Sequence, residues 1–198
     1  MVTIGVLALQ GDFGAHRRAL GRLGAATVAV RKSSDLDAAD ALVLPGGEST
    51  AMLRGIDRDR LEEPLAAFLR SGRPVLGTCA GAILLARRVL NPPQRSFGAL
   101  DIDVERNAYG TQLDSFAAPL DAVGPLAGTV GVFIRAPRIR RVGPGVTVLA
   151  REGGDPVLVR EGHIWAATFH PELGNDDRVL RVWLDLPTHD GRVAAPPG

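Results

Sequence analysis

The sequence predicts an α/β fold: a mostly parallel central sheet covered by helices on both faces, with extra antiparallel strands in the second half. Two observations support this prediction. In the first half, short apolar runs alternate with segments of 3.6-residue apolar period, in the order β-α-β-α-β-α. In the second half, apolar runs follow one another across short turns. In such a fold, reactive groups are expected at the carboxyl ends of the parallel strands.

The first half contains four apolar runs that are typical of buried strands, at residues 3–9, 27–30, 41–44 and 74–77. Helices are expected at 14–23, with Asp12 as the cap, around 61–69, and at 80–90. The last of these is strongly apolar and ends before Asn91-Pro92-Pro93, because two prolines cannot continue a helix.

The second half predicts strands at 101–104, 130–134, 146–150, 156–159 and 164–169, and a helix at 178–186. We expect residues 1–190 to form a single domain. Residues 191–198 are rich in Gly, Ala and Pro without an apolar period, so this tail is expected to be flexible.

Composition narrows the class of protein. The 198 residues are 45% apolar, which suits one compact domain, and 23 Lys+Arg against 22 Asp+Glu indicate neither a nucleic-acid nor a membrane partner. No apolar run approaches the roughly 20 residues of a membrane span. The N-terminus lacks the features of a signal peptide, and a single cysteine forms no internal disulfide. We therefore expect a soluble, cytoplasmic protein, and no Cys/His cluster points to a metal or cofactor.

The strongest chemical signal is Gly77-Thr78-Cys79-Ala80-Gly81, between a predicted strand and a predicted helix. This G-x-C-x-G pattern is typical of a nucleophile elbow, in which glycines two residues away on each side let strand and helix approach closely. The position at a helix start also favours the thiolate. A lone cysteine is more often a buried structural residue, but the flanking glycines favour a nucleophile.

A second signal is His170-Pro171-Glu172, directly after the predicted strand 164–169. In an extended chain His170 and Glu172 point to the same side, so that a carboxylate can orient an imidazole that activates a thiol. The tripeptide by itself is more typical of a surface turn. Together with the cysteine elbow it predicts a catalytic triad.

A third signal is Leu44-Pro45-Gly46-Gly47-Glu48-Ser49-Thr50, where a strand ends in glycines before a short helix. Backbone N–H groups here, with that of Ala80, can stabilise the oxyanion of a tetrahedral intermediate. Glycines alone are more typical of an ordinary tight turn.

Together these motifs resemble the class I glutamine amidotransferases, and within them the glutaminase subunits of pyridoxal 5'-phosphate synthase. The resemblance rests on LALQGDFGAH (7–16), LPGGEST (44–50), GTCAG (77–81), VERNAYGTQLDSF (104–116), GVFIRAP (131–137) and FHPEL (169–173). It implies a flavodoxin-like three-layer sandwich, with Cys79 as nucleophile, His170 as base and Glu172 orienting the histidine.

The resemblance also implies roles for further residues. Glutamine binding falls to Gly46, Gly47, Glu48, Arg106, Ile134 and Arg135. Gly47 and Ala80 supply the oxyanion N–H groups, and Gln10 lies in the region that responds to docking. A surface salt bridge is an equally good reading of the two arginines without the family. The implied partner is a (β/α)8-barrel synthase subunit that receives the ammonia in a multimeric complex, and no cofactor is needed.

Three alternatives stay open from the sequence. A glutaminase that serves another synthase would share the triad but should lack the motifs at 104–116 and 131–137. A different cysteine hydrolase of the same fold would often carry an elbow glutamate and no distal His-Pro-Glu. A catalytically silent regulatory subunit would not need the intact set of Cys79, His170 and Glu172.

Overall fold

A computed structural model of the chain describes residues 2–106 and 115–185. The predicted tail 191–198 and most of the motif 104–116 lie outside the described residues. The helices are α1 (Phe13–Arg22), α2 (Ser33–Asp37), α3 (Ser49–Arg58), α4 (Glu62–Arg70), α5 (Ala80–Leu85) and α6 (Arg178–Leu184), with a 3-10 turn at Gly124–Leu126.

The main sheet has eight strands in the order β2-β1-β3-β4-β13-β12-β11-β8. Its parallel part, with the 2-1-3-4-5 order of flavodoxin-like folds, is β2 (Ala26–Val30), β1 (Thr3–Leu7), β3 (Ala41–Leu44), β4 (Val75–Thr78) and β13 (Ile164–Ala167). Antiparallel strands β12 (Asp155–Glu161), β11 (Thr147–Glu152) and β8 (Asp121–Ala122) extend it. The predicted fold class is confirmed.

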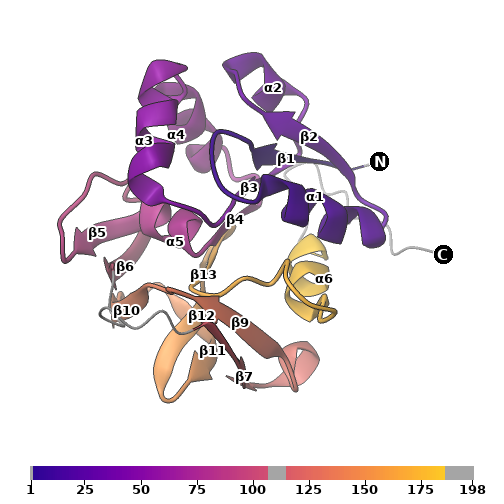
Figure 1. Ribbon diagram of the computed structural model, residues 1–198, viewed down its shortest axis with the longest axis vertical. Coiled ribbons are helices and arrows are strands. Elements are labelled where there is room, and N and C mark those ends of the chain that lie inside the picture. Colours follow the sequence, from indigo (N-terminus) through magenta and orange to yellow (C-terminus); the bar gives the residue numbers. More distant parts are fainter. Residues whose placement is uncertain (1, 107–114, 186–198) are drawn as a thin grey trace.

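Helices cover both faces of this sheet (Figure 1). Helices α1 and α6 pack on one face, where Leu20 and Trp183 join a buried apolar cluster with Ile4 and Val6 of β1. Helices α3, α4 and α5 pack on the other face, in a cluster that includes Met52, Ile56, Leu65 and Phe68. The two clusters hold the sheet between them, since each buried side chain gains roughly 1.5–3 kcal/mol on leaving water.

The predicted helix 80–90 is wrong in its second half. Helix α5 ends at Leu85, and the chain continues as strand β5 (Ala86–Leu90), which pairs in parallel with β6 (Leu100–Glu105). Within β5, Ala86 and Val89 are buried whereas Arg87 and Arg88 are exposed. The apolar content alone resembled a helix, but pairing with a distant strand satisfies the backbone here, and tertiary context overrides local propensity.

Two small sheets flank the main one. Strand β10 (Arg138–Val142) joins β6 and β5 in a three-stranded sheet, and β7 (Ser115–Pro119) pairs with β9 (Val130–Ile134). The sequence predicted β6 and β9 but missed their partners β10 and β7, and it also missed β8 and α2. β10 reads RIRRV and α2 has only five residues, so neither shows an apolar period that local pattern can detect.

Arginine and aspartate side chains link the strands of the three-stranded sheet. The side chain of Asp103, on β6, is only 4% exposed and accepts hydrogen bonds from Arg88 of β5 and Arg141 of β10, the latter with Nε–Oδ2 at 3.1 Å. The hydrogen bond from Arg88 is the main cause that lowers the pKa of Asp103. The charged carboxylate therefore stabilises the fold at neutral pH.

We expect Asp103→Asn to lower the free energy of unfolding by about 1–2 kcal/mol at pH 7. Because the folded-state pKa lies below the ordinary value of 3.8, this contribution is present above that pH and is lost as the pH falls through the folded pKa. Urea unfolding of the wild type and the variant at pH 7 and pH 3 measures the loss of unfolding free energy and its dependence on pH. Exposed Asp121→Asn is a control, with an expected effect near zero. An equal loss at both pH values would contradict the ion-pair explanation.

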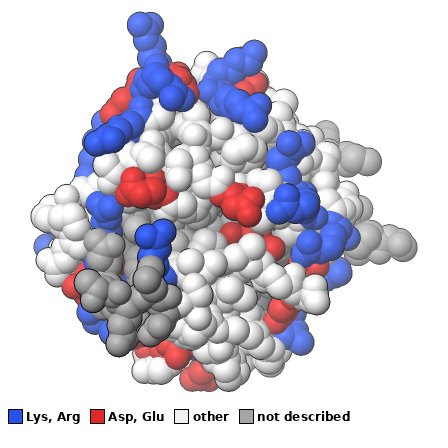
Figure 2. Space-filling view, viewed as in Figure 1, with Lys and Arg blue, Asp and Glu red and all other residues white. Residues whose placement is uncertain are grey.

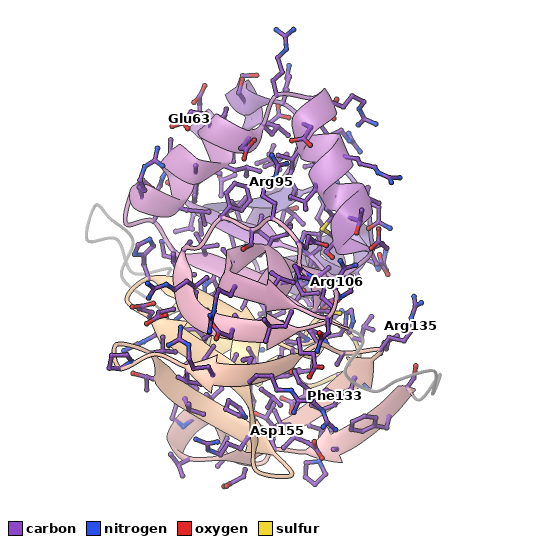
Figure 3. All side chains as sticks on the ribbon, turned by 90° about the vertical axis from the view of Figure 1, so that its left-hand side faces the viewer. Glu63, Arg95, Arg106, Phe133, Arg135 and Asp155 are labelled. Atoms are coloured by element: carbon purple, nitrogen blue, oxygen red, sulfur yellow. The ribbon has the colours of Figure 1, made fainter. Side chains whose placement is uncertain are left out.

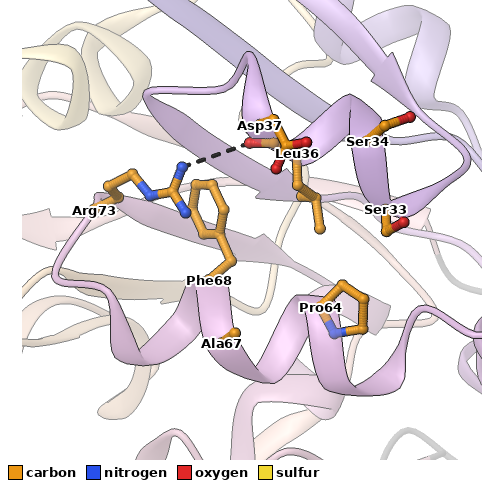
Figure 4. Close-up of a pocket in the computed structure, with 8 residues that line it drawn as sticks. All are labelled: Ser33, Ser34, Leu36, Asp37, Pro64, Ala67, Phe68 and Arg73. Atoms are coloured by element: carbon orange, nitrogen blue, oxygen red, sulfur yellow. Dashed lines mark hydrogen bonds between the residues drawn. The ribbon is translucent and has the colours of Figure 1, made fainter.

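A cavity of about 310 Å³ lies between α2 and α4 (Figure 4). Its arginine, Arg73, lies 3.7 Å above the ring of Phe68 and donates a hydrogen bond to Ala39 O at 2.9 Å. Arg73 precedes β4, whereas Cys79 follows it. The cavity is therefore at the amino ends of the strands. The hydrogen bond from Arg73 to Ala39 O holds the segment between α2 and β3 in place.

Basic and acidic side chains are interspersed on the face shown in Figure 2, without a continuous field of one sign among its described residues. This distribution agrees with the formal net charge of +1. Among the helices of the described ranges, none combines the length and apolarity needed to cross a membrane.

Candidate active site

Cys79 lies in the turn between β4 and α5 with φ +48° and ψ −102°, a conformation that side chains rarely adopt. A Cβ on Gly81 would lie 1.9 Å from Leu44 O, and one on Gly77 would lie 2.7 Å from Gly81 C. The predicted reason for both glycines is confirmed, because strand and helix backbones meet where any side chain would clash. Cys79 is 7% exposed, at the carboxyl end of β4.

His170 and Glu172 follow β13, the neighbour of β4 in the sheet. His170 Nδ1 donates to Glu172 Oε1 at 2.8 Å, which leaves Nε2 for Cys79. Burial opposes the imidazolium, but hydrogen bonds to Cys79 and Glu172 outweigh burial and raise the pKa of His170 to about 10. Burial likewise opposes the Glu172 carboxylate, yet the hydrogen bond from His170 leads the effects that lower its pKa.

Strand β9 closes one side of this site. His170 N donates to Val132 O at 2.8 Å, and Phe133 packs against Phe169 with ring centroids 5.6 Å apart. These contacts bring Ile134 O to 4.0 Å from Cys79 Sγ, the distance of a weak sulfur hydrogen bond. The structure therefore brings Ile134, a predicted binding residue, to Cys79 through its backbone.

The glycines after β3 pack against the loop after β1. A Cβ on Gly46 would lie 2.4 Å from His170 Cε1, and one on Gly47 would lie 2.3 Å from Gln10 Oε1. Gly47 also has φ +144°, which favours glycine. Gln10 Oε1 accepts a hydrogen bond from Glu48 N at 2.8 Å. Gln10, Gly46 and Gly47 thus lie together at the strand ends, and Ala80 directly follows Cys79.

Glu48 and Arg106 form an ion pair at the edge of the site. Arg106 Nη2 lies 3.3 Å from Glu48 Oε1 and 3.3 Å from Thr50 Oγ1. The Glu48 carboxylate also caps α3 by accepting from Ala51 N at 2.7 Å. Arg135 is exposed, with φ +45°, and projects from the surface in Figure 3 on the same side as Arg106. Of the two arginines, only Arg106 has its guanidinium in a described ion pair.

Gln94 lies beside the site, and local sequence pattern offered no reason to place it there. The stretch 91–97 belongs to none of the motifs on which the resemblance rests, yet it contacts one of them, the segment 44–50. Gln94 Oε1 accepts from Ser49 Oγ at 2.9 Å and from Thr50 Oγ1 at 3.3 Å. The loop after β5 thus supports the first turn of α3, beside Glu48.

His16 is the other residue that sequence reasoning missed. It is fully buried on α1, with Nε2 3.0 Å from Thr78 Oγ1 and 3.3 Å from Glu172 Oε2. One signal was present: His16 continues the apolar stripe of Ala19, Leu20 and Leu23 at helical spacing. A histidine in such a stripe needs a buried polar partner.

Comparison with known families decides the relationship, because residues 6–185 match the SNO glutamine amidotransferase family. The chain belongs to this family. Relatives of the SNO family include the pyridoxal 5'-phosphate synthase subunit PdxT of Koribacter versatilis, 53% identical over 92% of this chain and 94% of the relative. The PdxT subunit of Deinococcus radiodurans is 50% identical over 93% of this chain and 97% of its own.

Solved structures agree with the SNO family assignment. A crystal structure described as a glutamine amidotransferase is 47% identical, covers 91% of this chain and 96% of its own, and superposes with a TM-score of 0.86. The structure of PurLQS from Thermotoga maritima is 18% identical with a TM-score of 0.69, covering 92% and 96% of the two chains. At that identity the second match bears on the fold alone.

Proposed function

We propose that this chain is the glutaminase subunit of a pyridoxal 5'-phosphate synthase, hydrolysing L-glutamine to L-glutamate and ammonia. The observation that carries the proposal is the placement of Cys79 on a strained elbow, beside His170 whose Nδ1 bonds Glu172 at 2.8 Å. The family, which is one of glutamine amidotransferases, supports glutamine as the substrate. The relatives named PdxT support pyridoxal 5'-phosphate synthesis as the pathway.

The chemistry proceeds through a thioester. Cys79 Sγ, as the thiolate, attacks the side-chain amide carbon of glutamine, and the tetrahedral intermediate expels ammonia after His170 protonates the nitrogen. Neutral His170 then takes a proton from water, whose oxygen attacks the thioester carbon. Collapse breaks the C–S bond, releases glutamate and returns the thiolate beside protonated His170. The Glu172 carboxylate holds the ring orientation throughout.

Substrate binding follows from the charges around the cysteine. Free glutamine carries an ammonium, which the Glu48 carboxylate complements, and a carboxylate, which Arg106 and Arg135 complement. Gly46 leaves room for the imidazole, and the N–H groups of Gly47 and Ala80 stabilise the oxyanion. The carbonyl of Ile134 borders the same space.

The ammonia passes to a (β/α)8-barrel synthase subunit in a multimeric, cytoplasmic complex, with residues 1–190 acting as one glutaminase domain. The names of the PdxT relatives, which are synthase subunits, support a synthase partner. Gln10 lies between the glycines of the oxyanion region and Glu48 N, where docking can change the hydrogen bonds of that loop.

This proposal is tested by measuring ammonia release from glutamine by the purified chain. The measurement is made with and without the synthase subunit of a pyridoxal 5'-phosphate synthase. We expect release in both conditions or only with the synthase, and a higher rate with it. No release in either condition would contradict the glutaminase function. Release that the synthase does not increase would contradict the pathway, and would favour a glutaminase that serves another synthase.

A further inference from the structure

A buried histidine outside the predicted triad contacts the carboxylate that orients the base. His16 is 0% exposed, and the side chain of Glu172 is 2% exposed. Glu172 Oε1 accepts from His170 Nδ1 at 2.8 Å, whereas Oε2 lies 3.3 Å from His16 Nε2. The two oxygens of one buried carboxylate therefore face two different imidazoles.

The surroundings of His16 determine its protonation. Burial lowers the pKa of His16, and the charge of His170 acts in the same direction, while the charges of Glu172 and Asp12 partly oppose them. His16 is therefore neutral at pH 7 and carries a single N–H. A second imidazolium would also compete with His170 for the same carboxylate.

The contacts of its two nitrogens then decide which one carries the proton. Among the described residues, neither His16 Nδ1 nor Glu172 Oε2 has a hydrogen-bond partner, whereas His16 Nε2 is hydrogen-bonded to Thr78 Oγ1 at 3.0 Å and lies 3.3 Å from Glu172 Oε2. A proton on Nδ1 would be an unpaired buried donor, and it would turn the Nε2 lone pair toward a carboxylate; both are unfavourable. The proton belongs on Nε2, where Thr78 Oγ1 accepts it and the negative charge of Glu172 Oε2, 3.3 Å from Nε2, attracts it.

We infer that His16 is a positioning residue for glutamine hydrolysis, whose Nε2–H restrains the second oxygen of Glu172 so that the first stays aimed at His170; this inference rests on the proposed function. A carboxylate held at one oxygen can still turn about its last side-chain bond. Contact at both oxygens removes that freedom and keeps the proton of His170 on Nδ1, with Nε2 toward Cys79.

The fold explains why α1 can serve this role. Asp12 caps α1 by accepting from Ala15 N at 2.8 Å, and Ala19 and Leu20 anchor the helix on the sheet. Thr78, the last residue of β4, contacts His16 directly before the strained Cys79. The helix therefore links the nucleophile elbow to the carboxylate.

Two variants of nearly equal length separate hydrogen bonding from packing. His16→Gln keeps an N–H donor near the position of Nε2, whereas His16→Met fills similar space without one. Measured with the synthase subunit present, we expect His16→Met to lower kcat by about 10-fold or more with KM nearly unchanged, and His16→Gln to restore most of kcat. His163→Met, at the opposite end of β13, serves as the control and should keep kcat.

The wild-type protein supplies a second test that needs no variant to fold. Two-dimensional ¹H–¹⁵N spectra of the imidazole rings at pH 7 should show His16 as the neutral Nε2–H form. An Nδ1–H form or an imidazolium would overturn the inference, as would equal kcat for His16→Met and His16→Gln in folded protein. If the wild type released no ammonia, the proposed function would fail, while the spectra would still decide the state of His16.

Discussion

Replacing Cys79 with alanine should lower kcat for glutamine hydrolysis by at least about 10⁴-fold, because no other group in the site can form the thioester. Cys79 is the chain's single cysteine, so no second thiol can substitute for it. Ammonia and glutamate release, measured with the synthase subunit present, give the rate. A variant that keeps more than about 1% of the wild-type rate would exclude Cys79 as the nucleophile.

The fold of this variant should be little changed. Cysteine and alanine both carry a Cβ, so the strain at φ +48° is the same in the two proteins. Arg60→Ala is a matched control, because exposed Arg60 also has positive φ, at +53°, outside the site. It should keep full activity, and thermal unfolding of both variants should stay near that of the wild type.

Gly46→Ala should lower kcat by about 10²-fold or more while the protein stays folded. The new Cβ would lie 2.4 Å from His170 Cε1 and 3.0 Å from Nδ1, so the imidazole ring must leave its position beside Cys79. A displacement on the order of 1 Å in a catalytic group is enough for such a loss. Steady-state kinetics with the synthase subunit, together with urea unfolding, separates this effect from loss of stability.

The control for this variant is Gly21→Ala, in α1, where a Cβ meets nothing within 4 Å. This substitution should leave kcat unchanged and raise the free energy of unfolding by about 0.5–1 kcal/mol, because alanine favours the helix. Full activity of Gly46→Ala would show that the imidazole does not need the position it has in the structure.

Local pattern was enough to predict the elements that carry the chemistry. The glycines around Cys79 indicated an elbow, and the spacing of His170 and Glu172 after an apolar strand predicted that they face one site. The structure brings these three residues together at the carboxyl ends of β4 and β13, which are neighbours in the sheet. Their catalytic roles stay predictions until the variants are measured.

Local pattern failed where distant segments decide the structure. Residues 86–90 have the apolar content of a helix but form a strand, because β6 offers backbone partners and aspartates for Arg87 and Arg88. Gln94 reaches Ser49 and Thr50 across the fold, and nothing in the composition of its loop indicates that contact. Such pairings depend on the packing of whole layers.

The sequence by itself therefore determined the parallel sheet, the elbow at Cys79 and the pair His170 and Glu172, because short-range spacing sets each of them. Only the tertiary structure revealed that His16, 62 residues from Thr78 along the chain, faces the second oxygen of Glu172. A histidine in an apolar helical stripe looks like any core residue until the fold supplies its partner. His16 and Glu172 contact each other because a buried imidazole and a buried carboxylate both need polar partners and have few other polar groups within reach.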